Sequence, residues 1–124
     1  MSTLNVSNIT DGTTTVGTSY VVNGAAKAWL NFNQATPVVE DSFNISSVTD
    51  NTLGQFSPQF TNNMNNNDYS ITATASRAGA GNARTNFTYD NIATGSFKGF
   101  TYEIYSGDEY RDVPSGSTIH GDLA

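Results

Sequence analysis

The sequence has no cysteine, one histidine and only five basic residues, and each scarcity excludes a class of protein. Without cysteine there can be neither a disulfide framework nor a thiolate zinc site. The five basic residues are scattered and the net charge is −6, which argues against a nucleic-acid partner because phosphate binding needs clustered positive charge. No apolar run approaches the roughly 20 residues of a membrane span, and no signal-peptide pattern opens the chain. We therefore expect no nucleic-acid or membrane partner, and synthesis in a cytoplasm without a signal peptide.

Side chains suited to catalysis or metal binding are also scarce. The only histidine, His120, lies in a segment that we expect to be a solvated tail, so a Ser-His-Asp arrangement would require that tail to fold back. Two groups of carboxylates lack the spacing of a calcium loop: Asp108, Glu109 and Asp112, and Glu40 with Asp41. We expect a protein that is not an enzyme and that holds no cofactor or metal.

Small polar side chains are what the sequence has in quantity. Only 13 per cent of residues are charged and 36 per cent are hydrophobic, and Asn, Thr, Ser and Gly dominate the rest. Thr suits strands, Asn and Gly suit turns, and the seven Phe, six Tyr and one Trp supply large buried areas. Turn signals such as Asp11-Gly12 and Thr94-Gly95 recur at strand-length intervals. The composition predicts one all-β domain, a small antiparallel β-sandwich of jelly-roll type, with a core thin enough for association of identical copies to add burial.

Alternation of apolar and polar residues locates the expected strands. They cover residues 4–9, 20–22, 26–33, 42–49, 54–60, 69–76, 86–91 and 96–105. The segments 42–49 and 54–60 are the best candidates for a hairpin, because a short polar turn joins them. Period-two spacing places eight large side chains in the expected core: Leu30, Phe32, Phe43, Ile45, Phe56, Phe60, Tyr69 and Ile71.

Both ends of the chain are light in apolar residues. We expect residues 1–24 to form an N-terminal arm, residues 25–106 the sandwich, and residues 107–124 an extended C-terminal tail. Segments of this kind need another surface to become ordered. Their apolar residues are therefore candidate contacts with other subunits: Leu4, Val6 and Ile9 in the arm, and Val113 and Ile119 in the tail.

The only tryptophan, Trp29, stands on the polar face of an expected strand. In residues 26–33, the alternation places it with Lys27 and Asn31, opposite the apolar face. An aromatic side chain on a polar face can be buried by a neighbouring chain, so we predict that Trp29, Lys27 and Asn31 lie at a contact between subunits. The alternative is that a second sheet or an arm of the same chain covers Trp29 as an ordinary core residue.

Two consecutive motifs and two later blocks resemble one module. The motifs are Ala26-Lys27-Ala28-Trp29-Leu30-Asn31-Phe32-Asn33 and Ser42-Phe43-Asn44-Ile45-Ser46-Ser47-Val48-Thr49-Asp50-Asn51; the later blocks are Gln59-Phe60-Thr61 and Tyr69-Ser70-Ile71-Thr72-Ala73. The module is common in tailed bacteriophages, especially marine ones, and is usually identified as a tail-fibre or virion structural protein. The sequence departs from it at residues 34–40, where the usual Gly-Thr-Gly turn is missing, and after residue 76.

The resemblance implies a virion protein, and two functions are open. The first is a non-enzymatic tail-fibre protein, a homotrimer on the virion surface that attaches to a glycan or protein of the host. The candidate receptor loops contribute Asn63, Asn65 and Asn66, and Gly79, Gly81 and Asn82. The second is a head decoration or cement protein, whose arms would clamp neighbouring capsid subunits. An enzyme acting on carbohydrate is a third class, and it would need a pair of carboxylates flanking a cleft.

Overall fold

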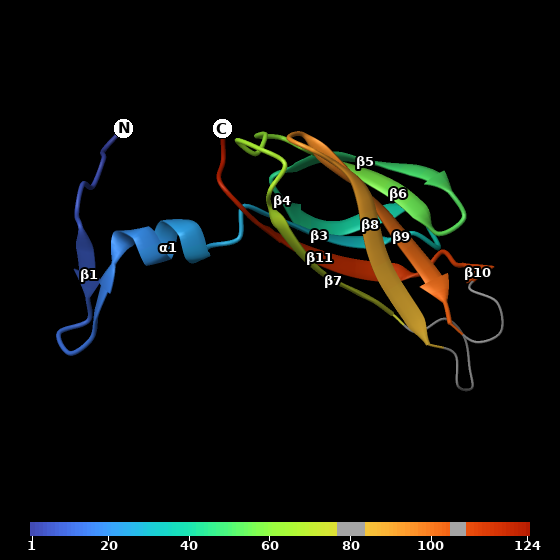
Figure 1. Ribbon diagram of the computed structural model, residues 1–124, viewed down its shortest axis with the longest axis horizontal. Coiled ribbons are helices and arrows are strands. Elements are labelled where there is room, and N and C mark those ends of the chain that lie inside the picture. Colours follow the sequence, from blue (N-terminus) through green and yellow to red (C-terminus); the bar gives the residue numbers. More distant parts are fainter. Residues whose placement is uncertain (77–83, 105–108) are drawn as a thin grey trace.

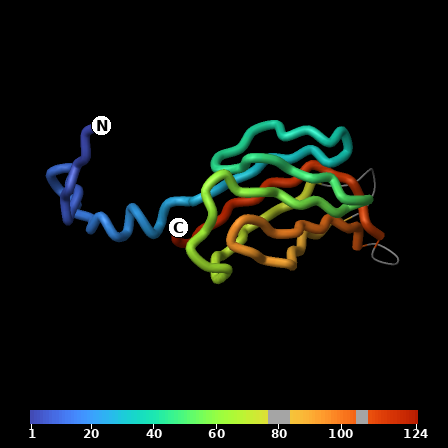
Figure 2. Tube along the Cα trace, turned by 90° about the horizontal axis from the view of Figure 1, so that it is seen from above, coloured from blue at the N-terminus to red at the C-terminus, as the bar shows by residue number. Residues whose placement is uncertain are grey.

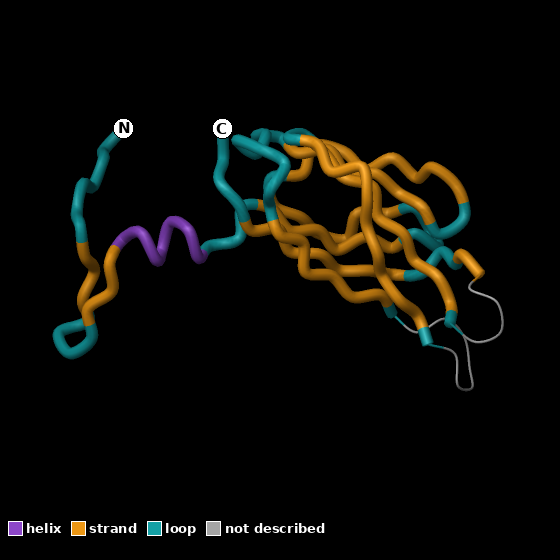
Figure 3. The backbone as a smooth tube through the Cα atoms, in the orientation of Figure 1, coloured by secondary structure: helices purple, strands orange, loops and turns teal. Residues whose placement is uncertain are grey.

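The computed structural model describes residues 1–76, 84–104 and 109–124, and in these residues the chain consists mainly of antiparallel strands (Figure 1). Two sheets face each other, and a slender arm extends from one end of them (Figures 1 and 2). The described helix lies in this arm, outside the sandwich (Figure 3). The prediction of a small all-β antiparallel sandwich is confirmed.

The first sheet has the strand order β4-β3-β11-β7. Its strands are β3 (Ala28–Asn33), β4 (Val38–Phe43), β7 (Ser70–Ala75) and β11 (Pro114–His120). The second sheet has the order β10-β9-β6-β5, and β8 also pairs with β9. Its strands are β5 (Ile45–Thr52), β6 (Gln55–Phe60), β8 (Thr85–Ala93), β9 (Ser96–Glu103) and β10 (Glu109–Tyr110). The predicted hairpin is confirmed, because β5 and β6 pair antiparallel across a short turn.

The core lies between the two sheets and combines large rings with small neighbours. The ring of Phe32 lies 5.1 Å from that of Phe56, measured between centroids. Beside Phe32, the central strand β11 offers Ser115, whose small side chain leaves room for the rings. Six of the eight predicted core residues are buried: Leu30, Phe32, Phe56, Phe60, Tyr69 and Ile71. A seventh, Ile45, is partly buried against them.

Phe43 is the core prediction that is wrong, because the chain changes sheet at Asn44. Strand β4 belongs to the first sheet and β5 to the second, and Asn44 between them has a φ of 57°, a left-handed conformation that Asn tolerates. Its side-chain amide donates to the carbonyl oxygens of Lys27 and Asn62, both at 3.0 Å, and its Oδ1 accepts from the Asn62 N–H at 2.7 Å. This corner leaves Phe43 54% exposed while Ile45 packs inward.

The extended C-terminal tail is also wrong for residues 109–124, the part of it that the structure describes. Strand β11 lies inside the first sheet, between β3 and β7. Val113 and Ile119 are buried in the chain's own core, so the prediction that they contact another subunit is wrong. This strand could not be recognised in the sequence, because Ser115 and Ser117 occupy its other core-facing positions and serine is not apolar.

The N-terminal arm consists of a hairpin and one short helix. Strands β1 (Asn8–Thr10) and β2 (Thr15–Gly17) pair with each other, and α1 (Thr18–Gly24) follows. The strand predicted over residues 20–22 is therefore wrong, and the one predicted over residues 4–9 overlaps β1 only at residues 8 and 9. No sheet edge is nearby, so the backbone N–H and C=O groups form the hydrogen bonds of a helical turn. One of them joins the Ala25 N–H to the Val21 carbonyl oxygen at 3.1 Å. The arm extends away from the sandwich (Figure 1).

Candidate attachment sites

The arm carries apolar side chains that the rest of the chain does not cover. Helix α1 contains no buried residue. Ile9 and Val16 are cross-strand neighbours in the hairpin, and both are exposed. We name the exposed set the arm apolar surface: Leu4, Val6, Ile9, Val16, Tyr20, Val21 and Val22. Three of the predicted subunit contacts, Leu4, Val6 and Ile9, belong to this surface.

Hydrogen bonds within the arm give it a defined shape. Asp11 Oδ1 accepts from the backbone N–H groups of Thr14 at 2.7 Å and Thr13 at 2.9 Å, and these bonds hold the pKa of Asp11 below its ordinary value. The Thr18 hydroxyl, at the start of α1, lies 3.0 Å from the carbonyl oxygen of Val6, to which it donates. The hairpin turn and the hairpin–helix junction are thus fixed by the arm's own groups.

Lys27 joins the arm to the sandwich. Its ammonium group donates to the carbonyl oxygens of Val22 and Ala25 at the C-terminal end of α1, where a positive charge also complements the helix dipole. Its backbone N–H donates to the carbonyl oxygen of Ile119 in β11 at 2.8 Å. Lys27, predicted to lie at a subunit contact, therefore donates three hydrogen bonds within its own chain.

Trp29 and Asn31 lie on the outer face of the first sheet. The residues of β3 between and beside them are buried between the sheets, as the alternation predicted. Trp29 has Phe43 of β4 on one side and Thr118 of β11 on the other. It is partly exposed and lines an open depression, so the alternative in which it is an ordinary core residue is wrong.

This depression continues into a second one on the same face. The first is about 300 Å³ and the second about 410 Å³, and they share Thr74 and Gly116. Trp29 and Thr118 line the first, and Asn31 lines the second. We name the two together the Gly116 groove. The sequence did not predict the groove, because most of its residues come from β7 and β11, and the pattern of β11 predicts a tail.

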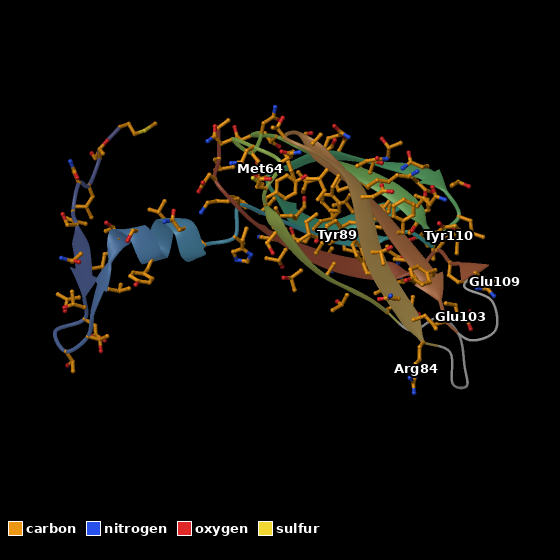
Figure 4. The ribbon with its side chains drawn as sticks, in the orientation of Figure 1. Met64, Arg84, Tyr89, Glu103, Glu109 and Tyr110 are labelled. Carbon is orange, nitrogen blue, oxygen red and sulfur yellow. The ribbon has the colours of Figure 1, made fainter. Side chains whose placement is uncertain are left out.

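The polar loop after β6, predicted to bind a receptor, is anchored at its centre. Asn63, Asn65 and Asn66 are exposed, but Met64 is buried and its backbone bridges to Leu123. Figure 4 shows Met64 at the end of the sandwich from which the arm leaves. The remaining receptor candidates lie outside the described residues: Gly79, Gly81 and Asn82.

A buried hydrogen-bond network closes the opposite end of the sandwich, where Figure 4 shows Glu103 and Glu109. Gln34 and Thr101 are both buried; the Gln34 amide donates to Asp50 Oδ1 at 3.1 Å, and the Thr101 hydroxyl donates to the Arg111 carbonyl oxygen at 2.6 Å. This network could not be predicted from the sequence, because its members come from distant segments. These polar groups are paired with one another, which makes the network a structural element.

Two carboxylates of the group predicted at residues 108–112 form bonds in the same region. Glu109 forms an ion pair with Arg111 at 2.7 Å, and Asp112 accepts a hydrogen bond from the Gly54 N–H at 2.6 Å. Asp108 lies outside the described residues. In the part of the chain that the structure describes, no cluster of three or more His, Asp or Glu side chains could hold a metal ion.

Tyr69 has a buried hydroxyl near the end of the sandwich from which the arm leaves. It donates toward the carbonyl oxygens of Ser96 at 2.8 Å and Ala93 at 2.9 Å. Burial of the ring raises the pKa of Tyr69 to about 12, because the phenolate would lose its solvation there. The folded protein therefore keeps this phenol protonated above the ordinary tyrosine pKa.

We expect the protein to lose stability between pH 10 and about 12. In this window an unfolded tyrosine releases its proton while folded Tyr69 retains it. The contribution of the protonated Tyr69 phenol to the free energy of unfolding is therefore complete below pH 10 and is lost as pH rises toward 12. Urea unfolding across this range should show a shallower decline for Tyr69→Phe, which starts about 1 kcal/mol less stable because the hydrogen bond is gone. Parallel declines in the two proteins would contradict the assignment.

No protein-family model, no curated protein and no solved structure matches the chain. Among the residues described, there is no helix with the length and apolar character needed to cross a membrane. The functional interpretation therefore rests on the arm apolar surface, the Gly116 groove and the sequence motifs.

Proposed function

We propose that this chain is a non-enzymatic surface protein of a bacteriophage virion, of tail-fibre type, which uses its arm for anchoring and its sandwich for host attachment. The arm apolar surface is the observation that carries the proposal. Exposed apolar groups on a segment separate from the main body are typical of a contact with another protein, because burying them there is favourable. The phage-like motifs of β3 and β5 support a virion as the setting.

The same surface supports association of identical copies. Tyr20 is 76% exposed and Leu4 is 82% exposed, and a neighbouring arm could cover both. Each arm already has its hairpin and helix fixed by internal bonds, so little order has to be gained on assembly. We therefore include in the proposal a homotrimer joined through its arms, which also binds other virion proteins.

A head decoration protein is the alternative, because one arm could clamp a neighbouring capsid subunit instead of a tail component. Two arms would have favoured this function. Strand β11 lies in the first sheet and β10 pairs with β9 in the second, so the described C-terminal residues do not provide the second arm. The tail-fibre interpretation therefore remains the leading one.

Counting the copies of this protein in particles of a phage that encodes it tests the proposal. Quantitative mass spectrometry of purified particles should find a few to tens of copies for a tail protein, and hundreds for a head protein. When the encoded chain lacks residues 1–24, the purified particles should contain far fewer copies of it. Complete absence of the protein from wild-type particles would contradict both functions.

Removing residues 1–24 is expected to convert the homotrimer to a monomer without unfolding the sandwich. The exposed arm residues supply the proposed contact, whereas the sandwich core contains none of them. Light scattering should show the particle mass falling to about one third, and circular dichroism should keep its strand signal. The triple substitution Leu4→Ser, Val6→Ser and Ile9→Ser should act in the same direction.

Val38 and Val39 offer a matched control, since they are exposed apolar residues of the sandwich and not of the arm. Replacing both by Ser should leave the mass of the assembly unchanged. A full-length chain that is monomeric at all concentrations, or a trimer that survives loss of the arm, would show that the arm does not join the copies.

A further inference from the structure

We infer that the Gly116 groove binds an uncharged sugar, with the Trp29 ring as the surface on which a sugar ring stacks. This inference names a ligand class for the attachment half of the proposed function, and only its biological role rests on that function. The argument comes from strand register, from the side chains around Gly116 and from their charge.

Strand pairing places the groove residues in two rows across the sheet. In one row Trp29 stands beside Thr118, which stands beside Thr72. In the next row Asn31 stands beside Gly116, and Thr74 follows. Gly116 has no side chain, so the groove has a floor of backbone bordered by an aromatic ring, hydroxyl groups and an amide.

The space above Gly116 is open. A Cβ atom placed there would have Thr74 Oγ1, at 4.0 Å, as its nearest neighbour. The two parts of the groove, about 300 and 410 Å³, meet at this residue, and each falls in the size range of ligand pockets. The two joined parts of the groove therefore suit an oligosaccharide better than a single small molecule.

The lining has the two kinds of group that a sugar requires. One face of a pyranose ring presents C–H groups, which carry slight positive charge and pack on the negative face of an aromatic ring. Its hydroxyl groups need hydrogen-bond partners at the edge. Among the described residues, the hydroxyls of Thr72, Thr74 and Thr118 have no hydrogen-bond partner, so they are available to a ligand.

The charged groups around the groove favour an uncharged sugar. The described residues that line the groove include no ionisable side chain. Asp41 lies beside Asn31 on the neighbouring strand β4, and its carboxylate would repel an anionic sugar. Lys27 shares the face, but its ammonium group is held by the carbonyl oxygens at the end of α1.

A second copy of the chain is the competing occupant, as the predicted role of Trp29 in a subunit contact implies. A protein surface would have to supply partners for three threonine hydroxyls and fill the hollow at Gly116. A hydroxyl buried without a hydrogen-bond partner would weaken such a contact. A sugar meets both needs with one ring, which is why we favour it.

The single tryptophan makes the test direct, because tryptophan emission, excited selectively over the six tyrosines, comes only from Trp29. The probes are four neutral oligosaccharides, maltohexaose, cellohexaose, laminarihexaose and mannohexaose, with oligogalacturonate as an anionic comparison. At least one neutral probe should change the emission saturably, with a Kd near or below about 1 mM, and oligogalacturonate should bind more weakly.

Gly116→Val should weaken binding by at least roughly tenfold, because valine fills the groove. The substitution meets no close neighbour and suits a strand, so its melting temperature should match the wild type. Thr118→Val should weaken binding several-fold by removing one hydroxyl at nearly constant shape. Thr88→Val, on the exposed face of β8 in the other sheet, is the matched control and should bind as the wild type does.

Four results would overturn the inference. These are no saturable change with any neutral probe, equal affinity in Gly116→Val, tighter binding of oligogalacturonate, or a Gly116→Val chain whose light-scattering mass falls. The last result would identify the groove as a contact between copies. None of the four bears on anchoring through the arm, which the truncation and particle experiments test separately.

Discussion

Phe32→Ala is expected to lower the free energy of unfolding by about 3–5 kcal/mol, whereas Phe43→Ala should lower it by no more than about 1 kcal/mol. Phe32 is 2% exposed and packs against Phe56, while Phe43 is 54% exposed on the outer face of the first sheet. Both substitutions delete the same atoms, so the difference isolates burial. Urea unfolding followed by circular dichroism measures both values.

The comparison also tests the change of sheet at Asn44. If β4 and β5 were one continuous strand, Phe43 and Ile45 would share the core face, and Phe43→Ala would be as costly as Phe32→Ala. Equal losses would therefore contradict the corner. A small loss at Phe43 with a large one at Phe32 agrees with the left-handed conformation of Asn44.

Period-two alternation predicted most of the core because most strands stay in one sheet over their whole length. It places Leu30 and Phe32 correctly on the inner face and Trp29 on the outer face. It fails at Asn44, because counting positions assumes that the chain direction and the sheet do not change. A left-handed Asn can be recognised from coordinates, but nothing in the local sequence distinguishes it from the many other asparagines.

The missed strand β11 has a different cause. Its inward residues Ser115 and Ser117 are small because the aromatic rings of other strands fill the space beside them. Burial at these positions is set by residues more than 80 positions away, such as Leu30, which is paired with Ser117. Local composition therefore indicates a polar tail, and only the long-range pairing makes it the interior of a sheet.

The two candidate sites differ in the same way, in how far the local sequence predicts them. The arm could be predicted, since its sparse apolar residues form a local pattern, and the exposed positions of Leu4 and Ile9 agree with that pattern. The Gly116 groove could be predicted only in part. The outward position of Trp29 follows from alternation, but Thr72 and Thr118 come beside it through pairing across three strands.

Gly54→Ala is expected to lower the free energy of unfolding by at least about 3 kcal/mol. Gly54 has a φ of 64°, and a Cβ atom there would lie 2.4 Å from the Thr101 carbonyl oxygen and 2.8 Å from the Arg111 nitrogen. Both neighbours are backbone atoms and cannot move aside at low cost. Backbone strain costs about 1–3 kcal/mol and overpacking a further 1–3 kcal/mol.

The loss should be concentrated at the end of the sandwich away from the arm. Gly54 accepts a hydrogen bond from the Thr101 N–H at 2.9 Å and donates one to Asp112 at 2.6 Å, so displacing it disturbs the buried network around Thr101. Gly116→Ala is the matched control, because its new methyl group meets open space, and its stability should stay within about 0.5 kcal/mol of the wild type. Hydrogen exchange should show faster opening of β9 and β10 in Gly54→Ala, with β3 and β7 less affected. A Gly54→Ala protein with wild-type stability would mean that the turn does not approach β9 as closely as the structure shows.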